Sequence, residues 1–184
     1  MLLRCRPKSR FVLLVVSMAL TSLTSLAQLG ASTNRIANGK LTWVDFSGPI
    51  DSTSTYSATT YWRITYSYRV LSIQGSLVTI DLQVSTLVDG KSWVAPNKRT
   101  DELLKHEQGH FDIARIHALK FKKEILSTLL VKDTYQETIK AVFQLYLVDA
   151  RRMGLEYDEQ TNHSRNRVEQ AKWNQKLENW LLNP

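Results

Sequence analysis

Residues 41–93 alternate between apolar and polar side chains, a period-two pattern that is typical of half-buried β-strands. The alternation is most regular in two runs separated by Gln74-Gly75-Ser76, a segment with the composition of a hairpin turn. The apolar positions of the two runs are Trp62, Ile64, Tyr66, Tyr68 and Val70, and then Val78, Ile80, Leu82 and Val84. The pattern predicts an antiparallel hairpin. We also expect strands at Leu41–Phe46 and Ser92–Val94, and a loop or edge strand at Ser52–Thr60.

The apolar residues change to a helical spacing after Pro96. Thr100 is a suitable N-cap for the first helix, because two acidic residues follow it in the first turn. The expected helices span residues 100–127, 133–154 and 164–182. Because the strands precede the helices instead of alternating with them, the predicted fold class is α+β. We expect an N-terminal antiparallel sheet in residues 28–98 and three helices in residues 99–184.

The first 27 residues have the three parts of a secretory signal peptide. Four basic residues precede the apolar run Phe11–Leu20, and small residues at Ser25 and Ala27 suit cleavage after Ala27. The run is too short to span a bilayer, which needs about 20 apolar residues. An uncleaved anchor that reaches Leu29 is the alternative. We therefore predict a signal peptide at residues 1–27 and a single secreted or periplasmic domain at residues 28–184. After cleavage this domain is not expected to be bound to the membrane.

The net charge and the cysteine content restrict the expected partners and the possible metal ligands. The formal net charge of +7 comes from 24 basic and 17 acidic residues, and the leader holds four of the basic ones, which leaves 20 against 17. A nucleic-acid-binding domain needs a clustered basic face, so nucleic acid is not an expected partner. The single cysteine, Cys5, lies in the leader. Any metal site in the exported domain must therefore use His, Asp and Glu.

The segment His106-Glu107-Gln108-Gly109-His110 is an H-E-x-x-H motif within the first predicted helix. Four residues make about one turn, so both imidazoles project from the same side and can share a metal ion. Glu107 lies about 100° round the helix, where it reaches a water on the ion more easily than the ion itself. This pattern of two ligands and a general base is typical of zinc peptidases.

Two residues of the motif are unusual for a helix. Glu107 points towards the apolar face that holds Ala114, Ala118 and Phe121, and burying an unpaired carboxylate is costly. Gly109 costs about 1 kcal/mol in a helix interior relative to alanine. Close approach of another chain segment or of a substrate would explain this glycine.

A catalytic zinc ion needs a third protein ligand and one open position. His117 lies roughly 10 Å further along the helix than His110, too far to bind the same ion. The remaining histidine, His163, ends the polar segment Tyr157–His163, which is either a solvated loop or part of the site. Because the two histidines of the helix need a third metal ligand, we favour the interpretation that this segment is part of the metal site.

Several of these residues resemble a bacterial family of unknown function whose members are described as predicted secreted zinc-dependent proteases. The similar segments are Leu103–Ala114, Leu41–Phe46, Ser92-Trp93, Tyr157-Asp158, Thr161–His163, Gln170 and Trp173. The resemblance implies a zincin-like domain in which His106 and His110 are ligands, Glu107 is the base and His163 is the third ligand. The family usually has glycine where this chain has Ser164.

The function expected from the sequence is that of a secreted zinc metallopeptidase. Its expected substrates are proteins or peptides, including those of the cell envelope. A zinc-bound water attacks the peptide carbonyl, and Glu107 takes its proton. Tyr157 either donates a hydrogen bond to the oxyanion or is a packed aromatic residue. Asp158 is expected to orient a ligand histidine. If His163 is not a ligand, Asp158 and Glu159 are the other candidates for the third position. Two alternatives are a zinc-stabilised exported binding module without turnover and an exported structural domain without metal.

Overall fold

The structure is a computed structural model that describes residues 35–36 and 39–184. The predicted signal peptide, including Cys5, lies outside the described residues. Within the described part of the chain, no helix is long and apolar enough to cross a membrane.

The predicted hairpin is the largest β-structure of the fold. Strand β3 (Trp62–Gln74) pairs antiparallel with β4 (Leu77–Val88), from Trp62 opposite Val88 to Gln74 opposite Leu77, with one shift of register between Val70 and Ser72. Gly75 adopts a positive φ of 59° in the turn, a conformation that glycine reaches without strain. Two short strands also pair with β4, namely β1 (Arg35–Ile36) and β6 (Leu130–Val131). The hairpin was therefore predicted correctly.

A second, two-stranded sheet joins β2 (Ala58–Thr59) to β5 (Trp93–Val94), which confirms the short strands expected in these segments. The strand expected at Leu41–Phe46 is wrong. Trp43–Asp45 forms the short 3₁₀-helix η1, because the Asp45 carboxylate accepts hydrogen bonds from the backbone and hydroxyl of Thr42 at 2.8 and 3.0 Å. The apolar residues Leu41 and Phe46 are still buried.

Three helices follow the strands, as predicted. Helix α1 (Asp101–Ser127) begins after Thr100, whose side chain accepts a hydrogen bond from the Leu103 backbone. Helix α2 (Tyr135–Thr161) does not end near Gly154 but continues for about two turns, and it stops where Asn162 adopts the left-handed conformation. Helix α3 (Arg167–Leu182) begins after the Asn166 cap. The described residues thus have an α+β fold.

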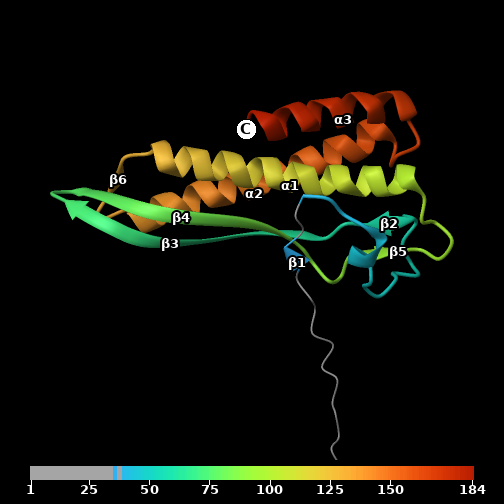
Figure 1. The fold of residues 1–184 in the computed structure, drawn as a ribbon, viewed down its shortest axis with the longest axis horizontal. Coiled ribbons are helices and arrows are strands. Elements are labelled where there is room, and N and C mark those ends of the chain that lie inside the picture. The colour runs from blue at the N-terminus through green and yellow to red at the C-terminus, as the bar shows by residue number, and fades with distance from the viewer. Residues whose placement is uncertain (1–34, 37–38) are drawn as a thin grey trace, which may run out of the picture. The chain divides into compact units, whose positions relative to one another are not determined.

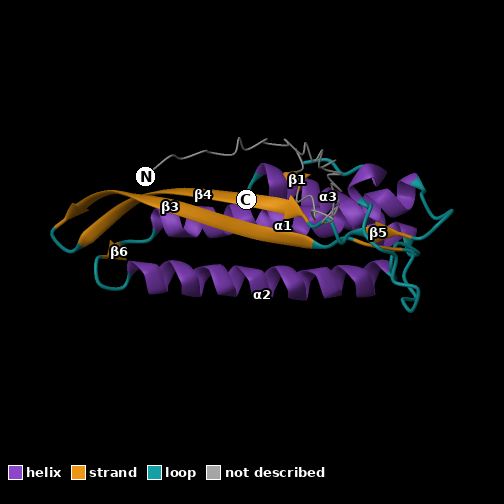
Figure 2. Cartoon of the chain, turned by 90° about the horizontal axis from the view of Figure 1, so that it is seen from below, coloured by secondary structure: helices purple, strands orange, loops and turns teal. Residues whose placement is uncertain are grey.

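Helix α1 contacts the hairpin, α2 and α3, and the three helices lie on the same side of the hairpin (Figures 1 and 2). Its C-terminal half packs through Phe121 and Ile125 against Leu82 of β4 and Ile139 of α2. Because α2 returns antiparallel to α1, its last two turns lie beside the H-E-x-x-H segment. Core residues at this end include Ile113, Ile116, Ala150, Tyr157, Trp173 and Leu177.

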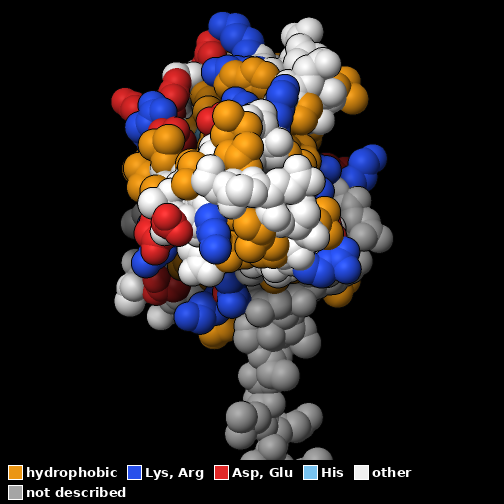
Figure 3. Space-filling model, turned by 90° about the vertical axis from the view of Figure 1, so that its left-hand side faces the viewer, with side chains coloured by type: hydrophobic (Ala, Val, Ile, Leu, Met, Phe, Trp, Pro, Cys, Tyr) orange, Lys and Arg blue, Asp and Glu red, His pale blue; other side chains and the backbone are white. Residues whose placement is uncertain are grey.

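The end of the fold that carries the hairpin turn exposes apolar side chains among basic and acidic ones (Figure 3). Leu71, Leu77 and Leu129 are 55%, 44% and 79% exposed. This end lies at the far end of α1 from the H-E-x-x-H segment.

Candidate metal centre

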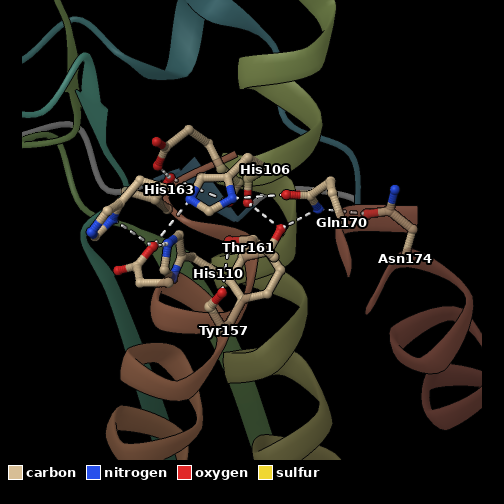
Figure 4. Close-up of polar contacts among 10 residues, drawn as sticks. His106, His110, Tyr157, Thr161, His163, Gln170 and Asn174 are labelled. Atoms are coloured by element: carbon tan, nitrogen blue, oxygen red, sulfur yellow. Dashed lines mark hydrogen bonds and ion pairs between the residues drawn. The ribbon is translucent and has the colours of Figure 1, made fainter. Parts of the chain in front are cut away.

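The two histidines of the motif meet an aspartate of α2. Nε2 of His106 lies 3.1 Å and Nε2 of His110 lies 3.0 Å from the same oxygen of Asp158, Oδ1. Figure 4 shows the imidazoles of His106 and His110 near each other, beside the ring of Tyr157. Among the described residues, His106, His110 and Asp158 form the group whose ligand atoms are close enough to hold one metal ion.

The residues of this group suit a divalent zinc ion. Two imidazole nitrogens and one carboxylate oxygen are three zinc ligands, and a catalytic zinc keeps a fourth position open. Ligand atoms that share a tetrahedral zinc lie roughly 3.4 Å apart, close to the separations from Asp158 to the two histidines. Three electron-pair donors that point at one spot also need protons or a cation between them. The donor set therefore fits the metal that the motif predicts.

The close contact of Asp158 with the two histidines shifts the pKa values of Asp158 and His110. Burial by itself would raise the pKa of Asp158, but hydrogen bonds from His106 and His110 outweigh burial and hold that pKa well below its usual value. Burial by itself would lower the pKa of His110, but the Asp158 carboxylate, with a smaller contribution from Glu107, raises it. The site thus favours positive charge beside the Asp158 carboxylate.

Glu107 lies next to this group without belonging to it. Its side chain is 2% exposed, and its Oε2 accepts a 2.6 Å hydrogen bond from the Thr60 hydroxyl, on the loop between β2 and β3. The expected orientation towards the buried side of α1 is confirmed. A buried carboxylate with one hydroxyl partner retains lone pairs for a water molecule or substrate proton.

His163 lies at the exposed side of the cluster but outside the group of three. Its Nδ1 is 3.3 Å from Asp158 Oδ1, its side chain is 40% exposed, and its ring lies 5.0 Å from that of Tyr56. Three successive residues, Asn162, His163 and Ser164, have positive φ values of 46°, 49° and 72°. The structure therefore brings Asp158, the reserve candidate, to the place expected for His163, whereas the other reserve, Glu159, is exposed and outside the group.

Tyr157 is fully buried and supports the cluster from behind. Its ring stacks on that of His106, with centroids 4.7 Å apart. Its hydroxyl donates to the His106 carbonyl at 3.1 Å and accepts from Gln170 at 2.6 Å. Burial raises its pKa well above the usual value. With both hydroxyl partners inside the protein, the oxyanion role considered for Tyr157 has no support in this geometry, and the packed-aromatic alternative fits.

Gly109 lies where Tyr157 crosses α1. A Cβ atom added to Gly109 would lie 2.5 Å from Cζ of Tyr157 and closer still to its hydroxyl oxygen. The expected close approach of another chain segment to Gly109 is therefore confirmed, and that segment is the end of α2.

Comparison with known proteins identifies a family. The family described as "Bacterial protein of unknown function (DUF922)" matches residues 36–164, which are 129 of the 184 residues. The chain belongs to this family. The match contains His106, His110, Asp158 and Glu107, so the whole candidate centre lies within the DUF922 segment. No curated protein and no solved structure matches the chain.

Sequence reasoning gave no role in the centre to three residues that support it in this DUF922 protein. Thr60 binds Glu107, Gln170 binds His106, and Gln108 binds the segment before η1 through Leu41 and Gly39. Each forms its contact across 47 to 69 residues of sequence, so no local pattern reveals the pair. Two signals were available, namely Gln170, which is among the residues of the family resemblance, and Gln108, an amide side chain between the two histidines of the motif.

Proposed function

We propose that this DUF922 protein is an exported zinc-dependent peptidase. The observation that supports the proposal most strongly is the convergence of His106, His110 and Asp158, from two helices, beside a buried glutamate that stays outside the ligand group. A purely structural zinc site usually has four protein ligands and needs no adjacent base, whereas a catalytic site has three ligands and an open position.

In this proposal His106, His110 and Asp158 hold the zinc ion. When bound there, zinc supplies a Lewis acid that acidifies water and polarises a carbonyl group. Glu107 accepts a proton from the attacking water and passes it to the leaving amine. Thr60 holds one oxygen of Glu107 and leaves the other free for this proton. The side chains of His110 and Asp158 are 17% and 26% exposed, which gives substrate a route to the site.

The proposed substrates are proteins or peptides outside the cytoplasm, including those of the cell envelope. This part of the proposal is supported by the signal-peptide pattern of residues 1–27 and by the resemblance noted in the sequence. The zinc-stabilised binding module remains the second candidate. The 2% exposure of Glu107 and its hydrogen bond to Thr60 favour the binding module, because a buried carboxylate that is held by a hydroxyl group can have a purely structural role.

The substitution Glu107→Gln tests the proposed function. We expect the variant to keep about one zinc ion per chain and to lose at least about 100-fold in peptide hydrolysis, because the base is removed while the ligands remain. The measurement is zinc content by mass spectrometry together with cleavage of a diverse peptide mixture. Glu124→Gln, an exposed position on the same helix, is the matched control and should behave as wild type.

Two outcomes would contradict the role of Glu107, namely retained hydrolysis in Glu107→Gln or loss of its zinc. A wild-type protein that binds zinc and cleaves no peptide in the mixture would favour the binding module instead.

A further inference from the structure

A buried chain of hydrogen bonds connects α3 to His106. The amide oxygen of Gln170 lies 3.0 Å from Nδ1 of His106, and its amide nitrogen donates to the Tyr157 hydroxyl at 2.6 Å and to Asn174 Oδ1 at 2.9 Å. Figure 4 shows the chain from Asn174 through Gln170 to His106 and Tyr157. Gln170 is 5% exposed, so water competes little for these contacts.

The orientation of the Gln170 amide follows from the chemistry of its neighbours. The His106 backbone carbonyl can only accept, so the Tyr157 hydroxyl must donate its hydrogen there. The Tyr157 oxygen must then accept from Gln170, which places the amide NH₂ at Tyr157. The amide oxygen is left facing Nδ1 of His106, and a carbonyl oxygen accepts only. Nδ1 of His106 therefore carries the hydrogen.

We infer that Gln170 is a positioning residue that holds the hydrogen of neutral His106 on Nδ1 and so leaves Nε2 as the nitrogen that binds the metal ion. A neutral imidazole has one hydrogen, so fixing it on Nδ1 leaves Nε2 free to bind a metal. The Tyr157 ring, stacked within 15° of the His106 plane, holds the ring orientation while Gln170 selects the tautomer.

This inference extends the centre beyond the matched segment of the family. Gln170 belongs to α3, whereas the DUF922 match ends at residue 164. It rests on the metal-binding part of the proposed function and not on peptide hydrolysis. Helix α3 then contributes to metal affinity as well as to the core, through one amide that reaches across to α1.

The tautomer can be read directly in the zinc-free protein. Long-range ¹H–¹⁵N spectra of histidine-labelled protein at alkaline pH distinguish a hydrogen on Nδ1 from one on Nε2. Because Asp158 Oδ1 lies 3.1 Å from Nε2 of His106 and also accepts a hydrogen, the spectra are recorded in an Asp158→Ala background, where we expect His106 to show the Nδ1–H form. Gln170→Leu, which removes the acceptor, should lose this preference, and Gln170→Glu, whose carboxylate still accepts from Nδ1, should keep it. Gln175→Leu applies the same change at an exposed position of α3 and should resemble wild type.

Zinc affinity, measured by competition with a chelator of known affinity, is the second readout. We expect Gln170→Leu to bind zinc about 10- to 100-fold more weakly, as is typical when the partner of a ligating histidine is removed. Gln170→Glu keeps the acceptor for Nδ1 but loses the hydrogens donated to Tyr157 and Asn174, so it should bind zinc less tightly than wild type but more tightly than Gln170→Leu, an order that a general packing defect would not give. The inference is overturned by an Nε2–H tautomer in the Asp158→Ala protein, by an unchanged tautomer when Gln170→Leu is added to it, or by unchanged zinc affinity in Gln170→Leu. Absence of zinc binding in the wild type would refute the proposed function, and the tautomer would still decide the role of Gln170.

Discussion

Gly109 and Gly154 both lie inside helices, but their surroundings give them opposite roles. At Gly109 an added Cβ atom would collide with the Tyr157 ring, whereas at Gly154 its nearest neighbour would be Nδ1 of His110, at an ordinary contact distance of 3.7 Å. Glycine is therefore required where α2 touches α1 at Gly109. At Gly154 it costs helix stability without a steric need.

We predict that Gly109→Ala and Gly154→Ala change the free energy of unfolding in opposite directions. Gly154→Ala should raise it by about 0.5–1 kcal/mol, through the higher helix propensity of alanine. Gly109→Ala should lower it by about 1–3 kcal/mol, because Tyr157 must move from a fully packed position. Urea unfolding of the two variants beside wild type measures both values. Stabilisation by Gly109→Ala would show that Tyr157 does not pack against α1 as described.

The proposed third metal ligand, Asp158, gives a second prediction at the residue scale. Asp158 Oδ1 lies within 3.1 Å of Nε2 of both His106 and His110, whereas His163 lies outside this group and stands at its exposed side. We expect Asp158→Ala to lose zinc under dialysis conditions in which wild type and His163→Ala retain it. Zinc retention after dialysis is measured by mass spectrometry, with Glu159→Ala as an exposed neighbour control. The reverse order, loss in His163→Ala and retention in Asp158→Ala, would restore the ligand set expected from the sequence.

At the scale of elements, α1 is buried on nearly all sides and places titratable groups inside the fold. His117 is 3% exposed, and its Nδ1 lies 2.8 Å from the Ile113 carbonyl, so this nitrogen is a donor. Burial lowers the pKa of His117 below its usual value. The unfolded chain therefore binds a proton in a pH range where the folded chain does not.

This burial predicts a pH dependence of stability. As the pH falls below about 6.5, the usual pKa of histidine, protonation of His117 in the unfolded chain should lower the free energy of unfolding. His117→Leu removes the group, so its free energy of unfolding should fall less than that of wild type between pH 8 and pH 5.5. The raised pKa of His110 has the opposite effect on the free energy of unfolding as the pH falls. This effect is present in both proteins, so it cancels when the two are compared. Urea unfolding across this range is the measurement, and parallel curves would contradict the prediction.

The elements also show what local sequence patterns can predict. The hairpin and the start of α1 were predicted well, because period-two alternation and a threonine cap are local signals. The η1 turn was mistaken for a strand, since the Asp45 cap outweighs the apolar residues around it. The end of α2 was placed too early because Gly154 resembles a helix terminator, whereas packing beside α1 continues the helix to Thr161.

At the scale of the whole fold, the candidate centre joins two antiparallel helices. His106, Glu107 and His110 could be identified from one pentapeptide, because their spacing alone defines a face of α1. Asp158 could not be singled out, since its place depends on the course of α2 and on core contacts such as Tyr157 against Gly109. Thr60 and Gln170 depend in the same way on β2 and α3, which only the folded chain brings together.

Metal content tests most directly the proposal that α1 and α2 share one zinc ion. The purified wild-type protein is loaded with zinc, separated by gel filtration and analysed by mass spectrometry, beside a His106→Ala, His110→Ala double variant. We predict about one zinc ion per wild-type chain and none in the double variant. A wild type without zinc, or a double variant that retains it, would contradict the assignment of His106, His110 and Asp158 as a metal centre.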